Sequence, residues 1–238
     1  MPLVAVVLLL AAGDSAADIL FRDRFSGPRL GDQWVKTKAG DFAEETVEVD
    51  GGRLRLAAST LGTDDRTVKY HGVRTREAIA ALERRMRLEV DLDWGSQANG
   101  CYMTCGLYLC PTAAQNPRDE PDWLRVEYVG VPPGLKARCQ VTICTAGQPR
   151  DLYTEGWPEK REGRTIGRQR LRIELCGQTL RLEENGILLC GASEVKLRFT
   201  RAYVYLQQSS HSNYPLREVF FDNLRIDQDP RPTAPAPE

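Results

Sequence analysis

The sequence predicts an all-β protein, a two-sheet antiparallel β-sandwich of the jelly-roll type formed by one domain. Apolar and polar residues alternate in short segments along most of the chain, as in strands with one buried face. Gly-Gly, Pro-Pro-Gly, Asn-Gly and Cys-Gly sequences separate these segments. The length of 238 residues suits one large β domain. Many short strands in a chain of this size are typical of sandwiches.

Nine segments show the alternation, and we expect strands in each of them. The segment 179–190 contains Asn185-Gly186, a pair that favours a tight hairpin turn. The segment 76–86, REAIAALERRM, is compatible with a helical turn or with a loop that leads into the next strand. The nine segments are 51–59, 84–94, 102–110, 123–130, 138–144, 169–176, 179–190, 201–210 and 217–226.

The N-terminal segment 1–17 has the pattern of a secretory signal peptide. An apolar run from Leu3 to Ala12 is followed by small residues that suit cleavage before Asp18. The run is too short for a membrane-spanning helix, which needs about 20 residues. The alternative is a buried first strand. The signal pattern predicts a secreted or periplasmic protein.

The C-terminal segment 228–238 is Pro-rich, and we expect it to be disordered or a linker. The jelly-roll domain is therefore expected over residues 18–227. The whole chain has 32 Lys and Arg against 33 Asp and Glu, a net charge of −1. This balance predicts no nucleic-acid partner and no attraction to an anionic membrane.

The seven cysteines are relevant to whether the protein contains disulfide bonds. In an exported protein they predict disulfide bonds, and the odd number leaves at least one thiol free or paired between chains. Cys176 and Cys190 flank the predicted hairpin, so they are candidates for a bridge.

One predicted strand carries an unusual set of side chains. In DWLRVEYVG, residues 122–130, the side chains of Trp123, Arg125 and Glu127 share one face. Leu124, Val126 and Tyr128 form the opposite, packing face. An aromatic ring, a cation and a carboxylate in the middle of a strand indicate a binding or catalytic surface.

The order of several motifs resembles that of the concanavalin A-like lectin and glucanase superfamily. The opening LFRDRFSGPRLGDQWVK and the following VEVDGGRLRLAAS resemble the first strands of its secreted members. RLRIELCGQTLRLEENGILL resembles the late hairpin, and REVFFDNLRID resembles the last strand. The resemblance runs from Leu20 to Asp227. It implies a concanavalin A-like jelly roll with two curved sheets and a carbohydrate groove on the concave face.

The strand 122–130 resembles the catalytic strand of the family 16 glycoside hydrolases, which reads E-x-D-x-E. Glu127 falls on the acid/base glutamate of that pattern. Trp123 stands where the nucleophilic glutamate would be, and Arg125 stands where the middle aspartate would be. A retaining glycosidase needs two carboxyl groups about 5 Å apart. With two of the three acids missing, the resemblance does not extend to hydrolase chemistry.

A second acidic strand, LEVDLDW, places three acids on one face. It precedes the strand at 102–110, whereas the glucanase signature comes later, so its position argues against catalysis. The acids could pair with arginines, Arg125 among them, across the sheet, or hold a cation. If the three strands are neighbours, one face presents a surface suited to sugar recognition. That surface would carry Glu89, Asp91, Asp93, Tyr108, Trp123, Arg125 and Glu127.

The segment 203–218 is a second candidate for ligand contact. Tyr205 and Gln207 share one face, and a polar loop follows that contains His211, Asn213 and Tyr214. A histidine near Gln and Tyr could serve acid–base chemistry. Jelly-roll polysaccharide lyases resemble this segment in residue types only. The alternative is a loop whose polar groups close a turn.

Two further predictions concern a loop at the groove rim and a metal site on the convex side. A long charged loop is expected over 151–167, where Trp157 is either a sugar platform at the groove rim or a hydrophobic plug. The family resemblance also implies a structural Ca²⁺ on the convex side, with Asp222 and Gly51 as ligands. The alternative for Asp222 is that it caps a turn or pairs with Arg22 or Arg24.

The sequence thus predicts a secreted, lectin-like carbohydrate-binding domain that lacks family 16 hydrolase activity. Its expected partner is a polysaccharide or other glycan, and its only expected cofactor is the structural calcium. One alternative is a glycosidase or lyase that uses Glu127 with Glu89, Asp91 or Asp93, or with His211. The other is a non-catalytic structural extracellular protein whose groove is filled by side chains.

Overall fold

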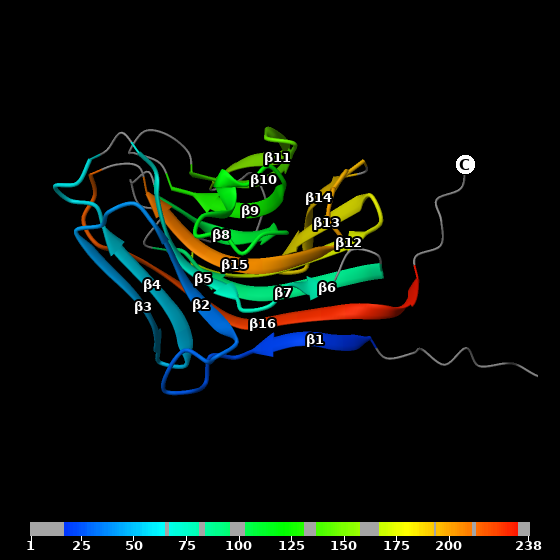
Figure 1. Ribbon diagram of the computed structural model, residues 1–238, viewed down its shortest axis with the longest axis horizontal. Helices are drawn as coiled ribbons and strands as arrows, with labels where there is room; N and C mark the ends of the chain where they lie inside the picture. Colours follow the sequence, from blue (N-terminus) through cyan, green and yellow to red (C-terminus); the bar gives the residue numbers. More distant parts are fainter. Residues whose placement is uncertain are drawn as a thin grey trace, which may run out of the picture.

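The structure is a computed structural model, and its strands pack in two layers (Figure 1). All strand pairs are antiparallel in the described part of the chain. The predicted two-sheet antiparallel sandwich is therefore confirmed. One 3-10 turn, η1 (Pro117–Asp119), is the only helical element in the described residues. The residues described are 17–64, 67–80, 84–95, 103–130, 137–157, 167–192, 194–210 and 213–232.

Eight strands form the first sheet, and β16 is its longest strand. β1 (Asp18–Asp23) pairs with β16 beside the main order, and the two strands run side by side in Figure 1. The main order is β14 (Ile187–Ala192), β13 (Thr179–Glu184), β12 (Arg168–Cys176), β7 (Arg84–Asp93), β16 (Arg217–Pro232), β4 (Arg53–Ser59) and β3 (Glu44–Asp50).

Eight strands also form the second sheet, with β8 and β15 at its centre. A short strand, β6 (Ile79–Ala80), pairs with β15 beside the main order. The main order is β11 (Gln148–Trp157), β10 (Ala137–Thr145), β9 (Trp123–Val129), β8 (Met103–Cys110), β15 (Arg201–Ser210), β5 (Lys69–Thr75) and β2 (Trp34–Ala39). All nine segments with alternating sequence are thus strands or, for 179–190, a hairpin.

The core lies between the two sheets and follows from the alternation along the strands. Leu88 and Leu92 of β7 and Val126 of β9 are fully buried in it. Trp94, directly after β7, stacks on Tyr128 of β9 with ring centroids 4.5 Å apart. Because aromatic rings bury large areas, this contact between a residue after the first sheet and a strand of the second holds the layers together.

The predicted position of β7 among the strands is wrong. We expected β8 to lie between β7 and β9, but β7 lies in the first sheet between β12 and β16. β8 is bordered instead by β9 and β15. Alternation shows which side chains share a face of a strand, but it does not show which sheet the strand joins. The acids of β7 therefore lie on the outer face of the first sheet, across the core from β9.

Two other boundaries differ from expectation. β16 continues to Pro232, past the predicted start of the Pro-rich tail after Asp227. β11 covers 148–157, so the first part of the expected loop over 151–167 is a strand that pairs with β10. The rest of that loop lies mostly outside the described residues. In both places charged residues and proline interrupt the alternation of apolar and polar residues, so the sequence contains no clear strand signal there.

The turns behave as their sequences predict. Asn185 and Gly186 both have positive φ, at 51° and 81°, and they join β13 to β14 as a hairpin. The segment 76–86 forms β6 and then enters β7, so the strand-entry alternative is confirmed over its described residues.

Cys176 and Cys190 are free thiols, and the predicted bridge between them is not formed. No helix in the described ranges has the length and apolarity to cross a bilayer.

His71 of β5 is completely buried between the sheets. Its Nε2 donates to Gln208 Oε1 at 2.6 Å, and its Nδ1 lies 3.6 Å from Glu45 Oε1. Burial lowers the pKa of His71, against the raising influence of Gln208 and Glu45. The folded state therefore keeps this histidine neutral at a pH where the unfolded chain protonates it.

We expect the free energy of unfolding to fall as the pH drops below about 6.5, the ordinary histidine pKa. A depressed folded pKa contributes stability above the unfolded value, and this is lost as the pH falls, by up to about 1.4 kcal/mol per pH unit. Urea unfolding of the wild type and His71→Gln from about pH 7 to about pH 5 measures it. The difference between the two proteins should shrink with falling pH, and a constant difference would contradict this role of His71.

Candidate functional site

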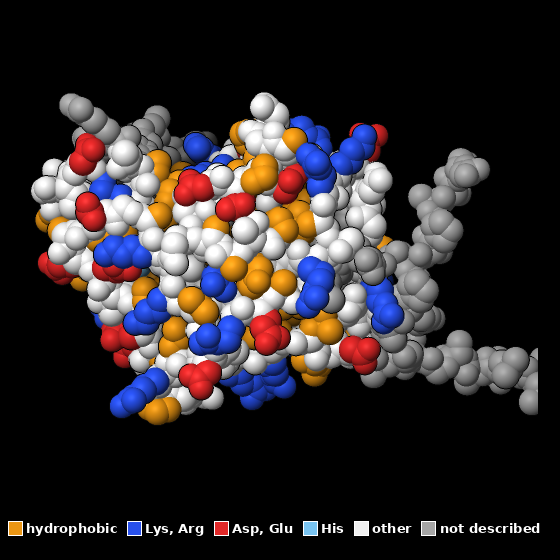
Figure 2. Space-filling model, viewed as in Figure 1, with side chains coloured by type: hydrophobic (Ala, Val, Ile, Leu, Met, Phe, Trp, Pro, Cys, Tyr) orange, Lys and Arg blue, Asp and Glu red, His pale blue; other side chains and the backbone are white. Residues whose placement is uncertain are grey.

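The candidate site lies on the outer face of the second sheet, at the middle of β9. Trp123, Arg125 and Glu127 project from this face, while Leu124 and Val126 face the core. The shared face predicted from the sequence is therefore confirmed. In register, Arg125 lies opposite Tyr108 of β8 and Thr142 of β10. Acidic and basic side chains are interspersed on the molecular face shown in Figure 2.

Glu127 is only 2% exposed, and two guanidinium groups approach it. Its Oε1 lies 3.0 Å from Arg125 Nη1 and 3.7 Å from Arg118 Nη2. Tyr108 donates its hydroxyl to Oε2 at 3.3 Å. Burial raises the pKa of Glu127, while the charge of Arg118 and the hydrogen bond from Tyr108 act in the opposite direction. Glu127 is thus a buried carboxylate that contacts two guanidinium groups and one hydroxyl.

Trp123 and Arg125 belong to a compact cluster beside Glu127. The guanidinium of Arg125 lies over the Trp123 ring, 5.4 Å from its centroid, and the Tyr108 ring meets Trp123 edge-on at 6.2 Å. Burial raises the pKa of Tyr108 well above its ordinary value, so this hydroxyl stays protonated. The cluster holds Arg125 in one orientation, because its ring contacts and its ion pair act on the same guanidinium.

The segment 111–122, which joins β8 to β9 and contains η1, supplies a residue that the sequence analysis missed. Arg118 donates from Nη1 to the Tyr70 hydroxyl at 2.7 Å, and its guanidinium lies 5.5 Å from the Tyr70 ring centroid. Asn116 caps η1, since its side chain accepts from Arg118 N at 3.2 Å. The sequence Asn-Pro at the start of η1 is the signal that could have revealed this cap.

The 111–122 segment is anchored at several points along its length. Tyr205 donates its hydroxyl to the carbonyl oxygen of Thr112 at 2.6 Å, and Gln115 Oε1 accepts from Lys38 N at 3.1 Å. At its far end Asp122 Oδ1 accepts from Ala146 N at 3.1 Å. These bonds fix the segment over the sheet. Tyr205, predicted as a ligand contact, therefore positions the segment that carries Arg118.

A pocket of about 450 Å³ opens between this segment and the sheet. We call it the Arg118 pocket. Arg118 is about a quarter exposed in it, whereas Trp123 and Arg125 are 5% and 7% exposed. Two aromatic residues, two guanidinium groups and an amide therefore surround one opening. Its lining comprises Val68, Tyr70, Asn116, Arg118, Asp119, Trp123, Arg125 and Pro149.

Two glycines allow neighbouring strands of the second sheet to approach each other closely. Gly106 of β8 lies opposite Glu127 in register, and a Cβ at this position would lie 2.1 Å from Val126 O and 2.6 Å from Glu127 Cα. Gly72 of β5 is equally tight, with its Cβ position 2.1 Å from Leu206 O. Only residues without a side chain permit this approach of the strands.

The acids of β7 do not join this site. Asp91 is 4% exposed and accepts from Arg170 Nε at 2.9 Å and from Asn223 Nδ2 at 2.9 Å. Glu89 pairs with Arg172 at 2.8 Å. Asp93 has Arg53 at 3.7 Å. The predicted alternative of cross-strand arginine pairs is therefore correct, but the partners come from the first sheet and not from Arg125.

The environment of Asp222 fits a calcium ion poorly. Its Oδ2 has Arg168 Nη2 at 3.5 Å and Asn223 Nδ2 at 3.1 Å. A guanidinium beside the carboxylate supplies the positive charge that an ion would bring. Gly51 lies in the turn between β3 and β4. Among the described residues no group of three or more His, Cys, Asp or Glu side chains is arranged to hold a metal. The calcium site stays a prediction.

The remaining predicted residues have other surroundings. Asn213 Oδ1 accepts from Gly62 N at 2.8 Å, and the backbone of Tyr214 bonds to Thr60, so these two residues are tied to the segment after β4. Gln207 is buried and donates to Thr37 at 3.5 Å. His211 and the side chain of Trp157 lie outside the described residues.

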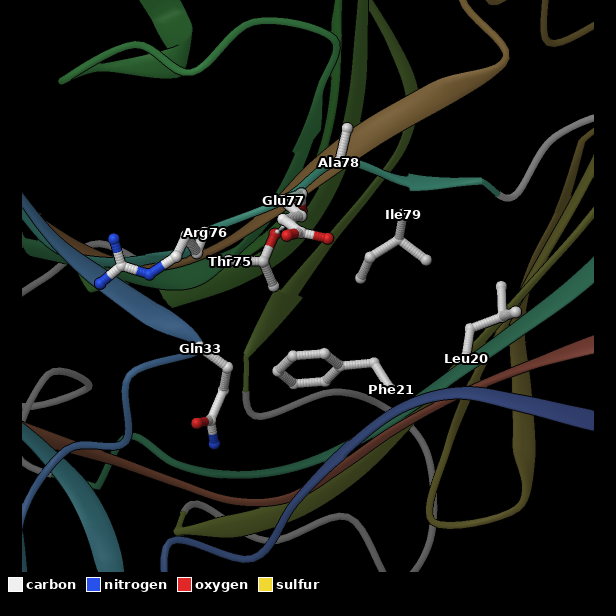
Figure 3. Close-up of a pocket in the computed structure, with 8 residues that line it drawn as sticks. All are labelled: Leu20, Phe21, Gln33, Thr75, Arg76, Glu77, Ala78 and Ile79. Atoms are coloured by element: carbon white, nitrogen blue, oxygen red, sulfur yellow. Dashed lines mark hydrogen bonds between the residues drawn. The ribbon is translucent and has the colours of Figure 1, made fainter.

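A second pocket of about 350 Å³ lies apart from this site, between β1 and the segment 75–79. Figure 3 shows that Leu20, Phe21 and Ile79 surround it, while the Arg76 side chain points away. Its lining is mainly apolar. It offers no convergent set of polar groups.

No protein-family model and no curated protein matches this chain. Solved structures do match it. An endo-β-galactosidase from Clostridium perfringens that releases GlcNAcα1-4Gal superposes with a TM-score of 0.66 at 9% identity, over 97% of this chain and 66% of that one. The chain thus spans 66% of that enzyme's length.

Two further structures match over nearly their whole length. The catalytic domain of an endo-1,3-β-glucanase (laminarinase) from Thermotoga petrophila has a TM-score of 0.63 at 13% identity, over 91% of this chain and 99% of that one. A Bacillus subtilis protein of unknown function with a galectin-like fold has a TM-score of 0.60 at 9% identity, over 90% and 98%. The chain has the concanavalin A-like lectin and glucanase fold. Identities this low establish the fold alone.

The concanavalin A-like fold confirms the architecture implied by the sequence resemblance. In this fold β9 presents Trp123, Arg125 and Glu127 on the outer face of the second sheet.

Proposed function

We propose that this protein is a non-catalytic carbohydrate-binding domain whose ligand occupies the Arg118 pocket. One observation carries the proposal: β9 has Trp123 and Arg125 where the glucanase signature has acids, and its remaining acid, Glu127, is buried against two guanidinium groups. A retaining glycosidase needs two carboxyl groups about 5 Å apart. The acids of β7, named as alternative partners of Glu127, lie on the other sheet.

The lining of the pocket supports sugar recognition. Tyr70 and Trp123 provide aromatic surface, and Arg118 and Asn116 provide hydrogen-bond donors around an opening of about 450 Å³. Sites for small ligands combine apolar walls with a few fixed polar groups. The anchored 111–122 segment supplies such fixed groups. The signal-like segment 1–17 supports our further proposal that the protein acts in the periplasm or outside the cell.

A second candidate function is a structural extracellular protein that binds no glycan. The burial of Glu127, Tyr108 and Gln207 favours it, because side chains fill this part of the face. The two candidates differ at the mouth of the Arg118 pocket, which only the first requires to be open.

We expect Val68→Trp to weaken glycan binding by about tenfold or more, because Val68 is 40% exposed at the pocket and an indole there fills its mouth. Affinity electrophoresis and calorimetry against a panel of neutral and acidic polysaccharides measure the effect. Leu61→Trp is the matched control, since Leu61 is 51% exposed and outside the pocket lining. Absence of binding by the wild-type protein to every polysaccharide would support the structural candidate.

The same panel is assayed for reducing ends and unsaturated products. The proposal predicts no product from the wild-type protein and no change with Glu127→Gln. Product that disappears with Glu127→Gln would overturn it in favour of the enzyme alternative, with Glu127 as a reacting group.

A further inference from the structure

We propose that the Arg118 pocket selects glycans that carry an anionic group, either the carboxylate of a uronic acid or a sulfate ester. This inference rests on the proposed function and names the ligand class of the same site. The anionic group would lie between the guanidinium groups of Arg118 and Arg125, with the sugar ring toward Tyr70 and Trp123.

The charges at the pocket floor support an anionic ligand. Arg118 and Arg125 both approach the same oxygen of Glu127, at 3.7 Å and 3.0 Å. Two cations thus share one buried carboxylate, and the part of the chain that the structure describes gives them no second buried anion. Asp119 also lines the pocket, but it is exposed, and its Oδ1 accepts from Asn116 at 2.9 Å. Solvent screens an exposed carboxylate, so it balances the buried cations weakly.

Hydrogen bonding at Arg125 supports the same conclusion. Among the described residues its buried Nε and Nη1 have no hydrogen-bond acceptor, although Nη1 lies within ion-pair distance of Glu127. The indole Nε1 of Trp123 is buried without an acceptor as well. Buried donors without acceptors are costly, and native sites with several of them commonly complete the set with a ligand or water. Arg125 and Trp123 therefore have more donors than acceptors around them among the described residues, and this excess favours an anionic ligand.

The shape of the donors favours a planar or tetrahedral oxyanion over a neutral hydroxyl. A guanidinium presents parallel N–H groups that match two oxygens of a carboxylate or sulfate. Arg118 is held in advance by the Tyr70 hydroxyl and ring, and Arg125 by the Trp123 ring. Because these side chains are already ordered, binding loses little of their conformational freedom.

The experiment compares each acidic polymer with its neutral counterpart. Polygalacturonate is paired with its carboxyl-reduced form, and dextran sulfate is paired with dextran, all at about 0.15 M NaCl. We expect the wild-type protein to bind at least one acidic member about tenfold or more tightly than its neutral form. The two pairs separate a carboxylate from a sulfate preference.

Arg118→Gln should bring that ratio close to one, and Arg29→Gln, the same charge change at an exposed site outside the pocket, should leave it unchanged. Arg118 is about a quarter exposed on a surface segment, so its replacement leaves the sheets intact. A ratio near one in the wild-type protein, or a ratio that survives Arg118→Gln, overturns the inference. If the protein binds neutral glycans and Val68→Trp abolishes that binding, the proposed function is still supported. If the protein binds no glycan at all, both the inference and the proposed function are wrong.

Discussion

Replacing Gly106 with alanine is expected to destabilise the protein by about 3 kcal/mol or more. The new Cβ would lie 2.1 Å from the carbonyl oxygen of Val126 and 2.6 Å from the Cα of Glu127. Both atoms belong to the backbone of β9, so no side-chain rotation relieves the overlap. β8 and β9 would have to separate at the centre of the second sheet, where their hydrogen-bonded ladder and the site both lie.

Urea unfolding followed by tryptophan fluorescence measures this effect. Gly191→Ala is the matched control, because Gly191 also lies in a strand, has no positive φ, and its Cβ position has no neighbour within 4 Å. The control should change stability by only a few tenths of a kcal/mol. Equal stabilities for the two variants would show that β8 and β9 are not packed as closely as described.

Removing Arg125 should also be costly, for an electrostatic reason. Arg125→Met is expected to destabilise the protein by about 3 kcal/mol, because it leaves Glu127 buried without its nearest cation. This is the low end of the range for a broken buried pair, since Arg118 remains 3.7 Å from the same oxygen. The double variant Arg125→Met with Glu127→Leu should recover most of the loss, because neither partner is then left unpaired.

A thermodynamic cycle of the two single variants and the double variant measures the coupling. The loss in Arg125→Met should also grow with rising pH. Burial already raises the pKa of Glu127, and losing a cation raises it further. A raised folded pKa contributes stability below the unfolded value and loses it as the pH rises. Additive effects of the two changes, with no dependence on pH, would contradict the buried ion pair.

The local features of β9 could be predicted from the sequence. Alternation alone placed Trp123, Arg125 and Glu127 on one face and Leu124 and Val126 on the other, because successive side chains in a strand point to opposite sides. The hairpin at Asn185-Gly186 was predictable for a similar reason, since those residues tolerate positive φ. Such features depend on residues close together in the chain.

The assignment of β7 to a sheet could not be predicted from the sequence. Its acids alternate as they would in either sheet, and only the strand order of the folded protein decides that they face Arg170 and Arg172 of β12 and Asn223 of β16. The pairing of Asp91 with Arg170 joins residues far apart in the sequence. No local pattern contains that information.

The Arg118 pocket was missed because its main residue lies in an irregular segment. Hydrophobic periodicity locates strands, but it gives no signal in a turn that contains proline, asparagine and aspartate. Tyr70 was missed for a different reason. It lies on β5, whose sequence KYHGVRT does not alternate regularly, and its contact with Arg118 depends on the folded sheet.

The 111–122 segment also bears on how ligand preference can change in this fold. Its two ends join the neighbouring strands β8 and β9, and its contacts to Tyr205 and Lys38 hold it from outside. Arg118 of the proposed site is therefore carried by a connecting segment, whereas Tyr70, Trp123 and Arg125 belong to the strands of the second sheet. Substitutions in this segment therefore alter one wall of the Arg118 pocket without repacking the core. One side of the pocket can then change in sequence while the two sheets stay the same.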